Sequence, residues 1–362
     1  MPLRKSTSSK KSNPSKKIDS STSEPKRHHP RFGFCLFEML LVLLFVATVS
    51  IFGISYFVLR QSVCPNTWNS ETFCNSVQND EESLAIMQSD YPFLRRWIRG
   101  LRAYHQLKET KLYADVDSTL LHAYYIPASK PTPNTAIVLH GYKSKALEML
   151  HIAYLYHHDL GFNVVLPDLR THGKSRGTHI GFGWQDAKDV LQWMEWANDE
   201  FGKDFGGQTQ MVVHGISMGA ATTMFVAGQN KHNFVRAYIE DCGYSSVQEE
   251  IAYVADRDYG LPEVPCITLA SQMCQWLYGW NFRDASCVEA LRHVDTPMLF
   301  IHGTADRYVP FDMVHQLYDA KPRNKDIWEV RDVIHARSYH DQREEYTQRV
   351  RDFINQYLYN GN

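Results

Sequence analysis

The stretch "VVHGISMGAAT", residues 212–222, constrains the fold most, because it sets one serine between an apolar run and a run of small residues. The run before it predicts a strand and the run after it a helix, so Ser217 lies where the two meet. So sharp a turn strains the serine backbone and leaves no room for side chains at Gly215 and Gly219. This is the setting of the Gly-x-Ser-x-Gly motif, which exposes a serine hydroxyl above a helix N-terminus. We expect Ser217 to be a nucleophile; the alternative is a purely structural tight turn.

Strand-like and helix-like segments alternate from Thr110 to the end of the chain. Short apolar runs such as "TAIVLHG", "FNVVLPD" and "PMLFIHG" stop at turn residues, and amphipathic segments such as "DAKDVLQWMEWANDEFG" separate them. Uninterrupted apolar strands that alternate with helices predict a mostly parallel sheet with helices on both faces. The fold class expected is therefore α/β.

A serine nucleophile needs a base, and the base needs a carboxylate that orients it. Asp306 follows "PMLFIHG" and His335 follows "DIWEV". Both are expected at the carboxyl ends of strands, where parallel sheets build their sites. Three rivals exist: Asp312 and His340 lie in helical patterns, and His302 lies in or just after a strand, where packing is expected. Asp306 and His335 are the predicted partners of the serine.

The attacked carbonyl also needs hydrogen-bond donors for its developing negative charge. One expected donor is the backbone N–H of Met218, directly after the serine. The second is the backbone N–H of Tyr142, in the loop after "TAIVLHG", and the Tyr142 side chain is a candidate to line the pocket.

These residues together resemble the α/β-hydrolase superfamily over about residues 110–360. The matching segments, in chain order, are "LHGY" (139–142), "PDLRTHGKSRG" (167–177), "GISMG" (215–219), "HGTADRYVP" (302–310) and His335. Within the superfamily the chain looks most similar to the bacterial membrane-anchored serine-aminopeptidase-like and acyl-esterase-like group. The resemblance implies Ser217 as nucleophile, His335 as base and Asp306 as the residue that orients it. It also implies that Asp168 and Arg170 hold their loop together.

The region of about 243–294 is short for a full cap domain and predicts a modest lid of two helices. Four aromatic residues in it are candidates for the floor of an apolar acyl pocket: Trp276, Tyr278, Trp280 and Phe282. The alternative is that they pack the lid on the core.

Residues 39–59 contain no charged side chain, and as a helix they span about 31 Å, close to the bilayer core. Nine basic residues precede this run, whereas Arg60 alone follows within the next twenty residues. We expect an uncleaved anchor over 32–59 after a disordered basic tail (1–31), with the tail cytoplasmic and the rest outside. A stalk is expected over 60–82 and the catalytic domain over 83–362; a cleaved signal peptide or a buried core helix is the alternative for the apolar run.

Seven cysteines are present, and six of them follow the apolar run: Cys64, Cys74, Cys242, Cys266, Cys274 and Cys287. Outside the cytoplasm they could form disulfides, and one that pins the lid is a candidate; free buried thiols are the alternative. No zinc-type spacing is present, so no metal is expected, and the net charge of −2 gives no sign of a nucleic-acid partner.

Together these features predict a serine hydrolase that cleaves carboxylic esters of a small-molecule acyl substrate through an acyl-enzyme, without a cofactor. The alternatives are a peptidase, an amidase or an acyltransferase on the same three residues, or a binding module that has kept the fold without the activity. The sequence does not identify the substrate or the oligomeric state.

Overall fold

The computed structural model describes residues 31–64 and 80–358 of the chain. The chain divides into two compact units, Met1–Val49 and Ser50–Asn362. The predicted basic tail lies outside the described residues except for Arg31. Most of the predicted stalk also lies outside them; its first residues continue the helix α1 (Arg31–Val63) and its last three begin α2 (Asp80–Asp90).

The described residues include one helix that is long and apolar enough to cross a membrane. This stretch of α1, Cys35–Val63, covers the predicted anchor (32–59) except for its first three residues, which also lie in α1, and it continues four residues beyond Leu59. Length and composition suit a membrane anchor and equally a signal sequence. The last turns of α1 belong to the larger unit, where Leu59 and Val63 are completely buried.

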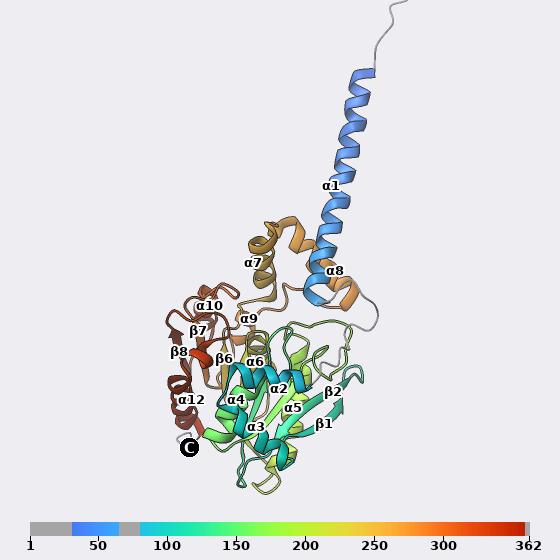
Figure 1. Cartoon of the computed structure of the whole chain (residues 1–362). Helices are drawn as coiled ribbons and strands as arrows, with labels where there is room; N and C mark the ends of the chain where they lie inside the picture. The colour runs from blue at the N-terminus through green and yellow to red at the C-terminus, as the bar shows by residue number, and fades with distance from the viewer. Residues whose placement is uncertain (1–30, 65–79, 359–362) are drawn as a thin grey trace, which may run out of the picture. The chain divides into compact units, whose positions relative to one another are not determined.

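An eight-stranded sheet forms the centre of the larger unit, in the order β1-β2-β4-β3-β5-β6-β7-β8 (Figure 1). The strands β3 to β8 run parallel, while β1 pairs with β2 and β2 with β4 in antiparallel fashion. The predicted mostly parallel sheet is confirmed. The strand bounds are β1 Lys108–Tyr113, β2 Leu120–Ile126, β3 Asn134–Leu139, β4 Asn163–Asp168, β5 Gln210–Ile216, β6 Val235–Asp241, β7 Met298–Gly303 and β8 Lys325–Val330.

Helices cover both faces of the sheet because alternate strand residues point to opposite sides. On β3, Ile137 and Leu139 join one apolar core, and Ala136 and Val138 join the other. The first core includes residues of α5 (Asp186–Gly202), α6 (Met218–Gln229) and α10 (Asp312–Ala320). The second includes residues of α2, α3 (Leu94–Ala103), η2 (Ala146–Met149), α4 (Leu150–Tyr154), η3 (Leu155–Asp159), α11 (Ser338–Asp341) and α12 (Arg343–Leu358).

The insertion between β6 and β7 forms the predicted lid, with α7 (Val247–Tyr259), η4 (Glu263–Ile267), α8 (Thr268–Tyr278) and the short α9 (Cys287–Leu291). Ser246 caps α7 by accepting a hydrogen bond from the backbone N–H of Glu249 at 3.2 Å, and the left-handed Gly260 ends the helix. The two predicted lid helices are α7 and α8.

The described cysteines are free thiols: Cys35, Cys64, Cys242, Cys266, Cys274 and Cys287. The predicted bridge at the lid therefore does not form between any two of them. The lid cysteines Cys266, Cys274 and Cys287 are buried among apolar side chains, where a thiol packs as a small apolar group. The seventh, Cys74, lies outside the described residues.

Candidate active site

Ser217 lies on the sharp turn between β5 and α6. Its backbone is in a strained, left-handed conformation with φ 58° and ψ −119°. A Cβ atom on Gly215 would overlap the carbonyl oxygen of Gly219, and one on Gly219 would overlap that of Leu139. The two glycines are therefore required by the close approach of strand and helix, as the sequence predicts.

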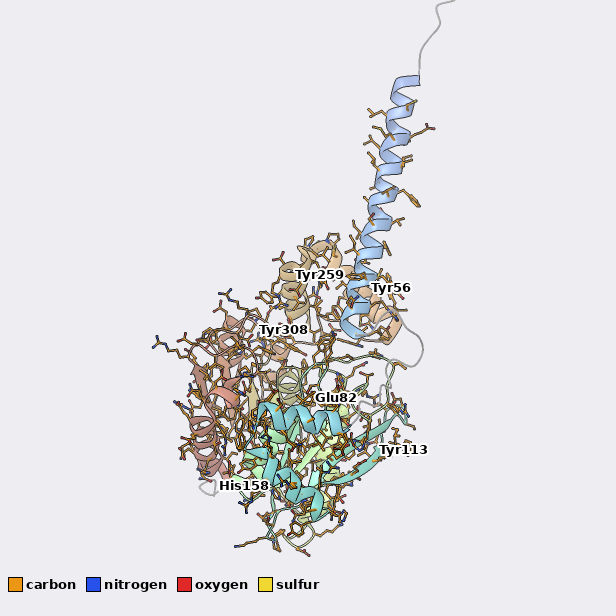
Figure 2. The ribbon with its side chains drawn as sticks, in the orientation of Figure 1. Tyr56, Glu82, Tyr113, His158, Tyr259 and Tyr308 are labelled. Atoms are coloured by element: carbon orange, nitrogen blue, oxygen red, sulfur yellow. The ribbon has the colours of Figure 1, made fainter. Side chains whose placement is uncertain are left out.

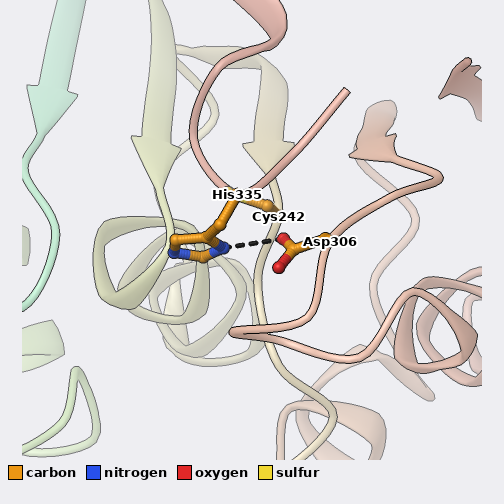
Figure 3. Close-up of side chains that lie close together, drawn as sticks. All are labelled: Cys242, Asp306 and His335. Carbon is orange, nitrogen blue, oxygen red and sulfur yellow. Dashed lines mark hydrogen bonds and ion pairs between the residues drawn. The ribbon is translucent and has the colours of Figure 1, made fainter. Parts of the chain in front are cut away.

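The three predicted catalytic side chains meet above this turn. Nε2 of His335 lies 2.9 Å from Oγ of Ser217, and Nδ1 of His335 lies 2.7 Å from Oδ2 of Asp306. Figure 3 shows the second of these contacts. A hydroxyl, an imidazole and a carboxylate in this order can transfer the serine proton to the imidazole and stabilise the resulting charge.

Several donors hold the carboxylate of Asp306. The backbone N–H groups of Tyr308 and Val309 donate to Oδ1 at 2.8 and 3.1 Å. Burial alone would raise the pKa of Asp306, but hydrogen bonds from His302 and His335 outweigh burial and lower this pKa to about 2. The group is therefore an ionised acceptor at neutral pH.

His302 was expected to be a packed residue, and it is buried, but it also reaches the carboxylate of Asp306, the predicted partner of the base. Its Nε2 lies 3.3 Å from Oδ2 of Asp306 and 3.2 Å from the carbonyl oxygen of Val309. The two acceptors require a proton on this nitrogen. The signal that could have identified this role is the spacing of four residues between His302 and Asp306 across the end of β7.

The two other rivals lie elsewhere. Asp312 is the first residue of α10. His340 lies in α11, where Arg337 and Asp341 contact its ring nitrogens at 2.8 and 2.6 Å. Neither residue contacts Ser217 or His335 within the described part of the chain.

The predicted donors for a negatively charged oxygen lie beside the serine. Met218 is the first residue of α6, so its N–H has no acceptor within the helix. The loop that carries Tyr142 passes close to Ser217: a Cβ atom on Gly141 would lie 3.4 Å from the serine Cβ. The Tyr142 side chain lines the cavities at the serine, as expected.

Two cavities meet at Ser217. The first has a volume of about 210 Å³, and its lining includes Phe57, Val58, Gln61, Ser62, Glu250 and Val254. The second has a volume of about 310 Å³ and includes His335, Asp90, Ser144 and Glu148. Tyr142 and Tyr308 line both.

The four lid aromatics that were candidates for the floor of an acyl pocket lie away from the serine. None of them lines either cavity at Ser217. Trp276 is exposed, Phe282 is completely buried in the core, and Tyr278 and Trp280 line a separate cavity beside Arg170. The two rings that follow the end of α8, Trp280 and Phe282, are buried, so packing is the better account for them, whereas Trp276 and Tyr278 lie within α8.

Asp168 and Arg170 hold their loop together, as the resemblance implies. Asp168 contacts Nδ1 of His122 at 2.8 Å and accepts from the backbone N–H of Ala146 at 2.9 Å. Arg170 pairs with Asp189 at 2.5 Å and with Asp117 at 2.7 Å.

Glu250 was not identified from the sequence, yet it lines the first cavity from α7. The residue is 5% exposed, and its Oε2 has no hydrogen-bond partner among the described residues. Burial, with the nearby charge of Asp306, raises the pKa of Glu250 to about 8. Its carboxyl group is therefore mainly protonated at neutral pH and can donate a hydrogen bond into the cavity.

Cys242 lies beside His335 and Asp306 (Figure 3), and the ligand-type atoms of the three lie within 4.8 Å of one another. Burial raises the pKa of the Cys242 thiol well above its ordinary value, so the thiol is protonated. Both ring nitrogens of His335 contact other side chains of the triad, Nδ1 that of Asp306 and Nε2 that of Ser217, so this arrangement suits an acid–base pair.

Known proteins resemble this chain in sequence and in fold. YqkD of Bacillus subtilis is 30% identical over 230 residues, covering 64% of this chain and 74% of that protein. A putative esterase of the same organism, YitV, is 26% identical over 196 residues, covering 51% of this chain and 72% of that protein. The solved esterase Pf2001 of Pyrococcus furiosus superposes with a TM-score of 0.55 at 23% identity, covering 69% of this chain and 92% of that one.

The likeness to the solved structure shows the fold, which is that of the α/β hydrolases, and the expected superfamily is confirmed. A family profile adds a narrower assignment, because that of the prolyl oligopeptidase family matches residues 150–361, more than half of the chain. The protein is an α/β-type serine hydrolase, and it belongs to the prolyl oligopeptidase family.

Proposed function

We propose that the chain is a membrane-anchored serine esterase that hydrolyses carboxylic esters through an acyl-enzyme on Ser217. The observation that carries the proposal is the continuous contact from Ser217 through His335 to Asp306, at 2.9 and 2.7 Å. The ester preference is supported by the esterase neighbours and by the uncharged state of Glu250 in the cavity.

In the first half of the reaction Oγ of Ser217 attacks the ester carbonyl while His335 takes the hydroxyl proton on Nε2. The new bond joins Oγ to the carbonyl carbon, and the carbonyl oxygen becomes an oxyanion. The N–H groups of Met218 and Tyr142 stabilise that charge. His335 then gives its proton to the alcohol oxygen, which leaves, and the acyl group remains on the serine.

In the second half a water molecule replaces the alcohol. His335 takes a proton from this water as it attacks the acyl carbon, and the proton then returns to Oγ as the carboxylic acid is released. Asp306 accepts a hydrogen bond from Nδ1 throughout and so fixes the tautomer that leaves Nε2 free to accept. The reaction requires no cofactor.

The proposed location is a membrane, with the apolar part of α1 as a single-pass signal anchor. The basic tail remains cytoplasmic and the catalytic domain lies outside, because the positive charges cluster before the apolar run.

A peptidase or amidase on the same triad is the second candidate, and the name of the family favours it. A peptidase that recognises a free amine needs an ionised carboxylate for it. Two carboxyl groups line the first cavity: Glu250, whose pKa of about 8 leaves it largely neutral at pH 7, and Asp258, which already pairs with Arg257 at 2.6 Å. Asp90 and Glu148 line the second cavity. A neutral carboxyl suits an uncharged ester better than an ammonium group.

Fluorophosphonate labelling of the full-length protein in detergent tests the proposal. The wild type is expected to label and the Ser217→Ala variant is not, because the probe forms a bond to an activated serine. An unlabelled wild type would leave a binding module as the better account. Turnover of p-nitrophenyl esters alongside aminoacyl amides then separates an esterase from a peptidase, with Ser217→Ala as the blank.

A further inference from the structure

The two cavities at Ser217 have different parts to play in the cleavage of an ester. His335 lines the second cavity and is absent from the lining of the first. The imidazole must protonate the departing alcohol oxygen, so the alcohol part of the substrate belongs on the side that His335 faces. The acyl part then occupies the first cavity.

The end of α1 forms one wall of this acyl cavity. Phe57, Val58, Gln61 and Ser62 line it from α1. The lid helix α7 lines it with the apolar Ile251, Val254 and Ala255 and with the polar Glu250 and the Arg257–Asp258 ion pair. All of these residues belong to the larger unit. The cavity has a volume of about 210 Å³, which is room for several carbon atoms.

Hydrogen bonds tie this end of α1 to the catalytic loop. The last carbonyl groups of a helix have no partner within it. The hydroxyl of Tyr142 donates to two of them, those of Gln61 and Ser62, at 3.1 and 2.8 Å. The backbone N–H of Ile180 donates to a third, that of Val63, at 2.9 Å. The residue proposed to supply an oxyanion donor is therefore fastened to the helix that lines the acyl cavity.

Apolar side chains continue from the cavity to the surface of the lid. The rings of Phe57 and Tyr259 pack edge to face at 6.0 Å, and Figure 2 places Tyr259 near Tyr56 of α1. Tyr259, Val264, Trp276 and Leu277 are exposed on the lid although they are large and apolar. An exposed apolar surface of this kind marks a contact with a membrane or a partner.

The position of the charge-free run indicates that this apolar surface faces a membrane. The charge-free run 39–59 ends within the turns that line the cavity: Phe57 and Val58 are in it, and Gln61 and Ser62 directly follow it. A helix that crosses a bilayer over this run leaves the bilayer at the wall of the acyl cavity. Tyr259 of the lid packs on Phe57 at that exit, and the other exposed apolar residues belong to the same lid, so the bilayer is the occupant that suits them.

We propose that the substrate is an ester lipid of the membrane in which the protein is anchored, an inference that rests on the proposed esterase function. Its acyl chain of medium or greater length enters the cavity between α1 and α7. Its small polar alcohol part lies in the second cavity, beside the polar groups of Asp90, Ser144 and Glu148. The end of the anchoring helix is thus part of the substrate site.

Chain-length selectivity of the full-length protein in phosphatidylcholine nanodiscs tests the acyl cavity. The substrates are p-nitrophenyl acetate, butyrate, octanoate and dodecanoate. We expect kcat/KM for octanoate to exceed that for acetate by at least about tenfold, because each buried methylene favours binding. Val58→Phe narrows the cavity and is expected to lower the ratio of the octanoate value to the acetate value at least about tenfold.

Tyr56→Ala is the matched control, since Tyr56 is the neighbour of Phe57 but lies outside the cavity lining. Its chain-length profile should equal that of the wild type. Phe57→Ala removes a ring from the lining of the acyl cavity and should raise kcat/KM for dodecanoate relative to that for octanoate. This change is opposite in sign to that of Val58→Phe, so the test still stands if Val58→Phe folds poorly. A flat wild-type profile, or equal profiles for Val58→Phe and Tyr56→Ala, would overturn the proposal.

The source of the lipid is tested by where the substrate is placed. A fixed amount of monooleoylglycerol is loaded at one mole fraction either into the vesicles that carry the protein or into separate protein-free vesicles, with the total phosphatidylcholine held constant. An enzyme that takes its substrate from its own bilayer has the higher initial rate in the first arrangement, whereas one that takes it from water has equal initial rates in both. Fluorophosphonate labelling and acetate turnover are measured on the same samples. If both are retained while the lipid results fail, this inference alone is wrong; if both are lost, the proposed function is wrong.

Discussion

His302 shares the carboxylate of Asp306 with the predicted catalytic base: its Nε2 lies 3.3 Å from the same Oδ2 that His335 contacts at 2.7 Å. His302 comes from the end of β7 and is completely buried, while His335 comes from the loop after β8. The carboxylate is thus held from the core side as well as from the side of the substrate. His302 is a positioning residue in this arrangement, because it acts on the triad through Asp306.

Replacing His302 by phenylalanine is expected to raise the pKa of Asp306 from about 2 toward its ordinary value of 3.8. A carboxyl group whose pKa is lowered in the fold adds stability above its unfolded pKa and loses it as the pH falls through the folded value. As the pH falls from about 4 to 2, the unfolding free energy of the variant should therefore decrease less steeply than that of the wild type. Its kcat should be roughly tenfold lower. Urea unfolding across this range and a pH–rate profile measure both. In the His302→Gln variant an amide N–H can replace Nε2–H, so both the pH dependence of stability and kcat should return part of the way to wild type. A His302→Phe variant with wild-type stability across this pH range and wild-type kcat would contradict this role.

The three triad residues should lose activity as a unit. Ser217→Ala and His335→Ala are expected to abolish acyl-enzyme formation, and their losses should not add. Asp306→Asn should preserve the fold but lower kcat by about 10⁴-fold, because the imidazole can then adopt the wrong tautomer. Burst kinetics with an activated ester measure each step.

The controls for the triad are the rival residues. Asp312→Asn and His340→Ala should change kcat by less than about tenfold, or ~1.4 kcal/mol of activation free energy. An inactive His340→Ala variant beside an active His335→Ala variant would show that the base is assigned wrongly.

A methyl group at Gly219 should disrupt the turn that carries Ser217. Gly219→Ala places a Cβ atom against the carbonyl oxygen of Leu139, and the expected cost is about 3 kcal/mol or more of unfolding free energy. Gly100→Ala is the matched control, since Gly100 lies in α3 with nothing within 4 Å of an added Cβ. This control should stabilise by about 0.5–1 kcal/mol through helix propensity. Chemical unfolding measures both; equal effects would contradict the steric argument.

Glu250 makes the fold less stable as the pH rises. Its pKa is raised from 4.5 to about 8 by burial, so the folded state retains a proton that the unfolded state has lost between these values. The unfolding free energy then falls by at most about 1.4 kcal/mol per pH unit in this window. Glu250→Gln should remove this contribution to the decrease of unfolding free energy with pH, which thermal unfolding between pH 5 and 9 measures. Asp256→Asn, on the exposed side of the same helix, should leave the slope unchanged; a Glu250→Gln slope equal to wild type would refute the assignment.

Protease access tests the orientation in the membrane. External protease added to intact cells, with any outer membrane permeabilised first, should remove the catalytic domain and leave an epitope in the basic tail intact. The reason is the clustering of positive charge before residues 39–59. A protected catalytic domain together with a digested tail would reverse the topology.

The sequence alone determined the class of fold and the three residues that meet at the site. Gly215 and Gly219 identify the turn because no other residue fits there, and Asp306 and His335 each directly follow an apolar strand. Local patterns suffice for these predictions, since the carboxyl ends of parallel strands must share one edge of the sheet. The lid helices and the antiparallel start of the sheet follow from similar local signals.

Only the tertiary structure decided which side chains surround the serine. The lid aromatics have the composition of an acyl pocket, but they lie away from the serine, while the cavity takes Val58 from the end of α1 and Glu250 from α7. The approach of His302 to Asp306 likewise depends on how the loop after β7 folds back on its own strand. A pocket is formed by residues distant in sequence whose positions depend on packing, and no periodic pattern along the chain records that packing.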